Sequence, residues 1–127
     1  MPAKSSHSDA RSQLAYLHDM LESARHVARY MDGVTFDTFW DDSEKRDAVA
    51  LRLAAIGEAA RHISPETEGK LAASGPGLPF KDIRGMRNRI AHDYGRVDYR
   101  VVWQVTQENI TSLVEVIGRY LSNEKSK

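Results

Sequence analysis

Residues 86–95, with the sequence MRNRIAHDYG, hold the side chains in this chain that are best suited to chemistry. They combine the imidazole of His92, the carboxamide of Asn88, several guanidinium groups and the phenol of Tyr94. Histidine takes and gives protons near neutral pH. A guanidinium such as that of Arg87 binds a phosphate and stabilises the charge that develops in its transition state. An RNA 2′-hydroxyl that loses its proton can attack the adjacent phosphorus, so this set suits phosphodiester cleavage without a metal.

Helical periodicity predicts how these side chains lie. Apolar Met86 and Ile90 are one turn apart and face the core, while His92 lies about 200° of rotation from Ile90. Asn88 and His92 are four residues apart and therefore share an exposed face. Arg87 is about 140° from His92, so its long side chain or a second copy of the protein must close the gap. The alternative interpretation is that His92 favours the negative end of the helix dipole and that Arg87 is merely solvated.

The elements that position this segment are all predicted to be helices. Apolar residues recur with a 3.6-residue period over long stretches, and no stretch shows the alternation of apolar and polar residues that is typical of a strand. We expect one all-α domain, an antiparallel bundle of about four to five helices. The first helix is predicted from Ser8, its N-cap, to about Met31, with Gly33 ending it. Its buried stripe comprises Leu14, Leu17, Leu21, Ala24, Ala28 and Met31.

Two further helical segments are predicted in the middle of the chain. Residues 35–41 form a single turn that carries Phe36, Phe39 and Trp40 towards the core or an interface. Asp42 or Ser43 then caps a second long helix. Its buried stripe comprises Val49, Leu53, Ile56, Ala60 and Ile63.

The second half of the chain is predicted to contain three helices. Ser64 and Pro65 open a short one that ends near Ala73, and a loop over residues 74–79 follows. The motif helix runs from Phe80 to about Asp93. Asp98 caps the last helix, whose stripe comprises Val102, Trp103, Thr106, Ile110, Leu113, Ile117 and Tyr120.

Composition narrows the class of protein. The chain has 127 residues, with 18 Lys and Arg against 18 Asp and Glu, which suits one domain able to bury a core. The absence of cysteine excludes disulfide scaffolds, thiol nucleophiles and cysteine-ligated zinc. No apolar run reaches the roughly 18 residues of a membrane helix, and the first residues lack the apolar stretch of a secretory signal. We therefore expect a cytoplasmic protein whose domain covers residues 8–121, with frayed ends at 1–7 and 122–127.

Charge is segregated although the total is zero. Between Asp32 and Glu44 the chain holds acids and no base, whereas residues 81–100 are rich in bases. The bases of that second segment are Lys81, Arg84, Arg87, Arg89, Arg96 and Arg100. Such a patch can hold a few phosphates, with an affinity that falls as salt rises. A solvated helix face is the alternative interpretation of each charged segment.

No metal site is expected. His18, Glu22 and His26 share one face of the first helix, and imidazole and carboxylate both bind zinc. The two histidines are separated by two helical turns, about 12 Å of rise, which is too far for one ion.

The motif resembles the R-x4-H-x-Y motif of HepT-like toxins in the HEPN superfamily of helical ribonucleases. Arg87, His92 and Tyr94 match its three defining residues, and Asn88 matches the polar residue that usually follows the arginine. The similarity extends outwards, since residues 49–64 resemble the family's second helix. Val97-Asp98 and Val102-Trp103 resemble the opening of its last helix. The resemblance covers most of residues 9–121.

The resemblance implies a metal-independent endoribonuclease that needs no cofactor. Arg87 would act on the phosphate, His92 would transfer protons and Asn88 would support them. Arg84, Arg89 and Arg96 would bind the RNA. Family members are homodimers whose two motif helices face each other across a cleft, and here we expect the interface to use the first helix and the motif helix.

The resemblance also implies a partner. Such toxins belong to type VII-like toxin–antitoxin systems, in which an MntA-type nucleotidyltransferase transfers AMP from ATP to the motif tyrosine, here Tyr94. The added negative groups would repel RNA beside the cleft. The alternative is a non-catalytic helical subunit that presents Tyr94 or another surface to a nucleotidyltransferase. A purely structural helical protein is a third reading.

Overall fold

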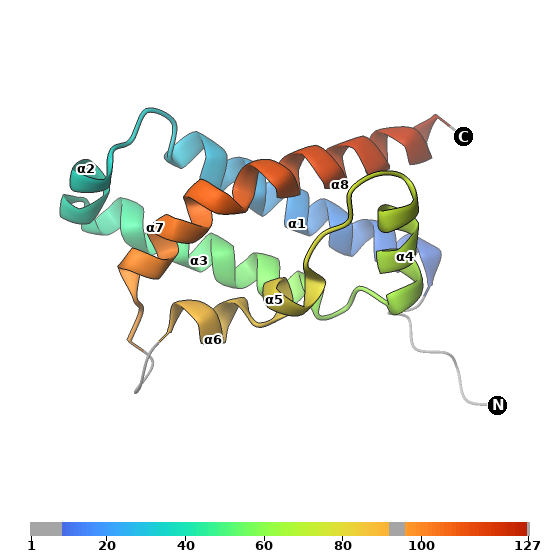
Figure 1. The fold of residues 1–127 in the computed structure, drawn as a ribbon, viewed down its shortest axis with the longest axis horizontal. Helices are drawn as coiled ribbons and strands as arrows, with labels where there is room; N and C mark the ends of the chain where they lie inside the picture. The colour runs from blue at the N-terminus through green and yellow to red at the C-terminus, as the bar shows by residue number, and fades with distance from the viewer. Residues whose placement is uncertain (1–8, 92–95, 127) are drawn as a thin grey trace.

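The computed structural model describes residues 9–91 and 96–126, and this part of the chain is an all-helical bundle, as the sequence predicts (Figure 1). The described residues contain eight helices and one isolated backbone bridge. The helices are α1 (Ala10–Tyr30), α2 (Phe36–Asp41), α3 (Ser43–Ala60), α4 (Pro65–Ala73), α5 (Phe80–Arg84), α6 (Met86–Ile90), α7 (Tyr99–Glu108) and α8 (Ile110–Lys125).

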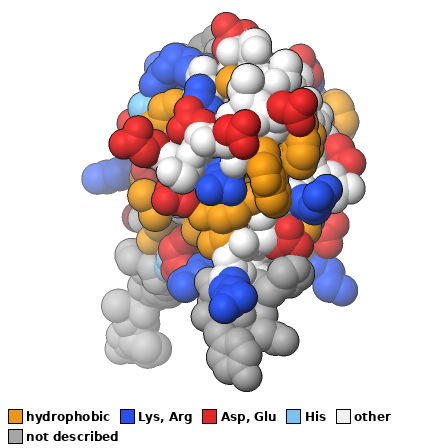
Figure 2. All heavy atoms as spheres, turned by 90° about the vertical axis from the view of Figure 1, so that its left-hand side faces the viewer, with side chains coloured by type: hydrophobic (Ala, Val, Ile, Leu, Met, Phe, Trp, Pro, Cys, Tyr) orange, Lys and Arg blue, Asp and Glu red, His pale blue; other side chains and the backbone are white. Residues whose placement is uncertain are grey.

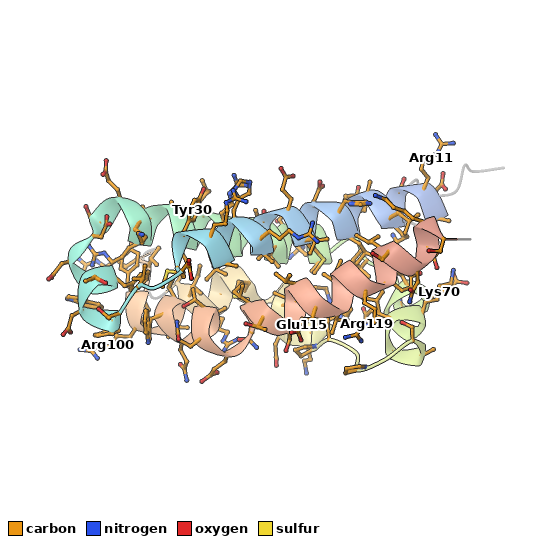
Figure 3. All side chains as sticks on the ribbon, turned by 90° about the horizontal axis from the view of Figure 1, so that it is seen from above. Arg11, Tyr30, Lys70, Arg100, Glu115 and Arg119 are labelled. Carbon is orange, nitrogen blue, oxygen red and sulfur yellow. The ribbon has the colours of Figure 1, made fainter. Side chains whose placement is uncertain are left out.

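The long helices α1, α3 and α8 form the body of the bundle. Helix α1 packs against both α3 and α8, and the view from above in Figure 3 shows α1 and α8 running side by side. Their inward faces supply fully buried side chains such as Leu17, Leu53 and Ile117. Short helices α5 and α6 pack on α3, and α7 crosses the same helix. The motif segment is therefore held mainly by α3.

The predicted apolar stripes are largely confirmed. Every position of the stripe predicted for the second long helix is buried, although Ile63 lies beyond the end of α3, and most predicted positions on α7 and α8 are buried too. In α1 the buried face is shifted, because Ala28 is exposed while Met20 and Val27, which the prediction omitted, are completely buried.

Side-chain caps begin most of the helices. Asp42 caps α3 by accepting from the backbone N–H of Lys45, and Asp98 caps α7. Ser64 caps α4, with Pro65 in its first turn, as predicted. The N-cap of α1 is Asp9 rather than Ser8, because the Asp9 carboxylate accepts from the N–H of Arg11.

The predicted count of four to five helices is corrected to eight in the described residues, because two expected helices are each divided and the expected turn over residues 35–41 is a helix of its own, α2. The last one breaks at Asn109, between α7 and α8. The motif helix breaks at Gly85 and ends at Ile90 instead of Asp93. Glycine is a poor helix former, and Gly85 is the residue that separates α5 from α6.

Two further observations concern the described residues. None of their helices combines the length and apolarity needed to cross a membrane. Within residues 9–91 and 96–126, no three histidine, aspartate or glutamate side chains gather closely enough to hold a metal ion.

Candidate functional site

The motif segment is pressed against α3 at Gly57. A Cβ atom at this glycine would lie 2.9 Å from the carbonyl oxygen of Ile83 and 2.9 Å from the Cβ of Met86. Only glycine allows α3 to approach the end of α5 and the start of α6 so closely. Gly57 thereby sets the position of the short helix α6 that carries Arg87 and Asn88.

Helix α6 ends at Ile90 because the chain turns into an extended conformation. Ala91 has φ −109° and ψ 142° and forms an antiparallel bridge with Val97. The backbone N–H of Asp98 donates to the carbonyl oxygen of Ile90 at 2.6 Å. The ends of the intervening segment are thus pinned together.

Helix α6 ends at Ile90, and the predicted shared face of Asn88 and His92 stays a prediction. His92 and Tyr94 themselves lie outside the described residues.

Arg87 and Asn88 are both exposed on α6. Among the described residues, none forms a hydrogen bond or ion pair with the Arg87 side chain. None of its donors is therefore taken up by a described residue, and a guanidinium carries five N–H donors that suit an anion.

Arg87 lies at a groove of about 370 Å³ between α3 and α6, here called the α3–α6 groove. From α3 come Asp47, Ala50, Leu51 and Ala54. The opposite side consists of Arg87, Ile90 and Ala91, and Val97 and Tyr99 complete it. The small side chains of the three alanines leave room for the groove, while Leu51 is 71% exposed at its edge.

The other predicted RNA-binding arginines differ in their surroundings. Nη1 of Arg84 donates to Oε2 of Glu68 at 2.6 Å, which ties α5 to α4 with both side chains half-buried. Arg89 is half-buried, and its Nη1 lies 3.4 Å from Oδ1 of Asn109. Arg96 is exposed. Arg87 and Arg96 are therefore more accessible than Arg84 and Arg89.

Sequence reasoning did not single out Asp47 and Tyr99, which the fold brings to the same groove. The Tyr99 hydroxyl donates to Oδ1 of Asp47 at 2.5 Å. This hydrogen bond raises the pKa of Tyr99, and partial burial adds to the effect. The phenol therefore keeps its proton at neutral pH. The two residues are 52 positions apart, so no local spacing reveals the pair.

Aromatic rings and guanidinium groups pack together next to Tyr99. The guanidinium carbon of Arg46 lies 4.6 Å from the centre of the Tyr99 ring and 5.6 Å from that of Trp40. Arg100 lies 5.3 Å from the same Trp40 ring. Figure 2 shows this end of the molecule, where apolar side chains lie among interspersed acidic and basic ones. These contacts fasten α2 and the start of α7 to α3 and so fix the wall of the groove.

Comparison with known proteins identifies the family. Residues 20–120 match the family described as "Ribonuclease HepT-like". "Probable ribonuclease HepT" of Thermococcus cleftensis is 33% identical over 103 residues, which are 81% of this chain and 90% of that protein. A Methanocaldococcus jannaschii protein named "Putative RNase" is 32% identical over 110 residues, 84% of this chain and 97% of its own length. No solved structure matches the chain. The chain therefore belongs to the HepT-like ribonuclease family of the HEPN superfamily.

Proposed function

We propose that this chain is a metal-independent endoribonuclease that acts as the toxin of a type VII-like toxin–antitoxin system. The observation that carries the proposal is the Arg87 guanidinium, which is exposed at the α3–α6 groove with no partner among the described residues. An unpaired guanidinium beside a groove is suited to holding a phosphate. Membership of the HepT-like ribonuclease family supports RNA as the source of that phosphate.

The proposed reaction divides its steps among the motif residues. His92 accepts the proton of the RNA 2′-hydroxyl, the 2′-oxygen bonds to phosphorus, and the bond from phosphorus to the 5′-oxygen breaks. The protonated His92 gives a proton to the leaving 5′-oxygen, so that the products are a 2′,3′-cyclic phosphate and a 5′-hydroxyl. Arg87 stabilises the negative charge on the phosphoryl oxygens, and Asn88 supports it. Arg84, Arg89 and Arg96 contribute positive charge along the RNA.

The proposed working form is a homodimer in which two motif segments face each other. Leu51 is 71% exposed on α3, directly beside the groove, and Ala54 and Ala55 continue this small apolar surface. The outward face of α1 instead carries charged side chains such as Asp19 and Arg25. We therefore place the interface on α3 and α6 rather than on the first helix.

The proposed control is AMP transfer to Tyr94 by an MntA-type nucleotidyltransferase antitoxin. Each AMP would add negative charge close to Arg87 in sequence and would oppose RNA binding. The competing function is that of a non-catalytic subunit of a nucleotidyltransferase. RNA cleavage that depends on the motif residues would distinguish the ribonuclease from such a subunit.

The decisive experiment measures cleavage of mixed cellular RNA by the purified, unmodified protein in EDTA. The parent should cleave, His92→Ala should lose about 10²- to 10⁴-fold in rate, and Arg87→Ala should lose both turnover and RNA affinity. Arg11→Ala is the matched control, because Arg11 is an exposed arginine at the start of α1 (Figure 3). Equal background in the parent and both motif variants would reject the ribonuclease and favour the binding subunit.

A further inference from the structure

The α3–α6 groove has the size and lining of a site for one small planar ligand. Its volume of about 370 Å³ lies at the small end of the range for ligand sites, which are mostly apolar with a few placed polar groups. Ala54 and Leu51 on one side face Ile90 and Val97 across it. A single nucleobase presents apolar faces and a polar edge, and so matches this lining.

The polar atoms at the end of the groove formed by Asp47 and Tyr99 can accept hydrogen bonds, and none of them has a proton left to donate. Oδ1 of Asp47 already accepts the proton of the Tyr99 hydroxyl. The carboxylate retains further acceptor positions on both oxygens, and the phenolic oxygen retains lone pairs. The Asp47 side chain is exposed to an incoming ligand. A ligand edge with N–H donors is therefore favoured here, and an edge with carbonyl oxygens is opposed.

The four RNA bases differ in how well they fit such an end. Guanine offers two adjacent donors, N1–H and the N2 amino group, which a carboxylate can accept together. Adenine and cytosine each offer one amino group beside a ring nitrogen that is itself an acceptor. Uracil offers one N–H between two carbonyl oxygens, which would face the acceptors of Asp47 and Tyr99.

We infer that the α3–α6 groove is a nucleobase subsite that selects guanine through Asp47, held in place by Tyr99. The inference rests on the proposed function, because Arg87 at the same groove would hold the phosphate next to the bound base. Bases of single-stranded RNA are free to enter a groove in this way. The ribonuclease would therefore cleave preferentially at phosphates that adjoin guanosine.

Mapping of cleavage positions tests the selection directly. The substrate is an RNA in which all four bases flank otherwise equal cleavage sites. Digestion by the parent and by Asp47→Asn is stopped at the same overall extent, and the cleavage positions are compared. The amide replaces one acceptor oxygen by a donor, so the ratio of cleavage beside guanosine to cleavage beside uridine should fall about tenfold. Tyr99→Phe should lower the ratio less, since the carboxylate remains. Asp41→Asn makes the same chemical change on an exposed α2 carboxylate outside the groove, and it should leave the ratio unchanged.

Direct binding separates this inference from the proposed function. Calorimetric titration with guanosine 3′-phosphate and with uridine 3′-phosphate should show tighter binding of the guanosine ligand, and Asp47→Asn should abolish the difference. An unchanged cleavage pattern in Asp47→Asn, with cleavage still dependent on Arg87, would overturn the subsite and leave the ribonuclease standing. If cleavage did not depend on Arg87, the proposed ribonuclease function would be rejected. The titration would still show whether the groove prefers guanosine. If Asp47→Asn weakened self-association and left the base ratio unchanged, a second copy would occupy the groove and the subsite would be overturned.

Discussion

The backbone N–H of Asp98 donates a hydrogen bond to the carbonyl oxygen of Ile90 at 2.6 Å. In an uninterrupted helix that carbonyl would accept from the N–H four residues further along. The contact instead joins the end of α6 to the N-cap of α7, and the bridge between Ala91 and Val97 lies directly inside it. Helix α6, which carries the catalytic candidate Arg87, therefore ends at Ile90, before the position of His92 in the sequence.

The N-cap of α7 should stabilise both the fold and the site. Oδ1 of Asp98 accepts from the N–H groups of Arg100 and Val101. Asp98→Ala should lower the free energy of unfolding by about 1 kcal/mol and reduce RNA cleavage, because the pinned end of the motif segment loosens. Urea unfolding followed by circular dichroism measures the first effect. Asp98→Asn is the control, since asparagine is an equally good N-cap, and an equal loss in that variant would contradict the capping role.

The close approach at Gly57 should tolerate no side chain. Gly57→Ala places a Cβ atom 2.9 Å from a backbone oxygen of α5, so α5 and α6 must shift. We expect a loss of about 1–3 kcal/mol in the free energy of unfolding and reduced cleavage through the displacement of Arg87. Gly69→Ala is the matched control in α4, where an added Cβ meets nothing within 4 Å. That variant should be neutral or more stable by up to about 1 kcal/mol. Equal urea midpoints for the two variants would show that the contact is not tight.

The location of the proposed dimer interface can be decided by two aspartate substitutions. Leu51→Asp puts a charge on the exposed apolar surface of α3 and should shift the mass in solution from dimer to monomer. Ala15→Asp makes a comparable change at an exposed position of α1 and should leave the dimer intact. Light scattering after size-exclusion chromatography reports both masses. Dissociation by Ala15→Asp alone would move the interface to the first helix, and a monomeric parent would reject the dimer.

The Tyr99–Asp47 hydrogen bond should make stability depend on alkaline pH. The pKa of Tyr99 is raised above 10.0 in the folded protein, so the folded state holds the phenolic proton more tightly than the unfolded state. The corresponding stabilisation is complete below about pH 10, the tyrosine value in an unfolded chain, and is lost as pH rises through the folded pKa. Tyr99→Phe should lower the free energy of unfolding by about 0.5–1 kcal/mol at pH 8, because the bond is near the surface.

Urea unfolding at pH 8 and at pH 10.5 checks this linkage. The difference between parent and Tyr99→Phe should narrow at the higher pH. Tyr16→Phe serves as the comparison, because Tyr16 is a half-buried tyrosine of α1 whose ring stacks on His62, away from Asp47. A difference that stays constant between the two pH values would show that the phenolic proton of Tyr99 is not held by Asp47.

Much of the fold follows from local pattern. The 3.6-residue stripe of α3 and the caps Asp42, Ser64 and Asp98 are properties of neighbouring residues, and all of them are confirmed. The family could also be identified from the motif and its flanks, since residues 20–120 match it. The roles of Arg87, His92 and Tyr94 stay predictions.

The tertiary structure decided what local pattern cannot encode. Helix α3 approaches Ile83 and Met86 closely at Gly57, on either side of the break at Gly85, and the N–H of Asp98 bonds to Ile90 at the end of α6. The pairing of Asp47 with Tyr99 joins two helices that are distant in sequence. Periodicity reports which face of a helix is apolar, because burial repeats along one element. Where two elements meet, and which polar groups they bring together, is determined by packing among side chains from different parts of the chain.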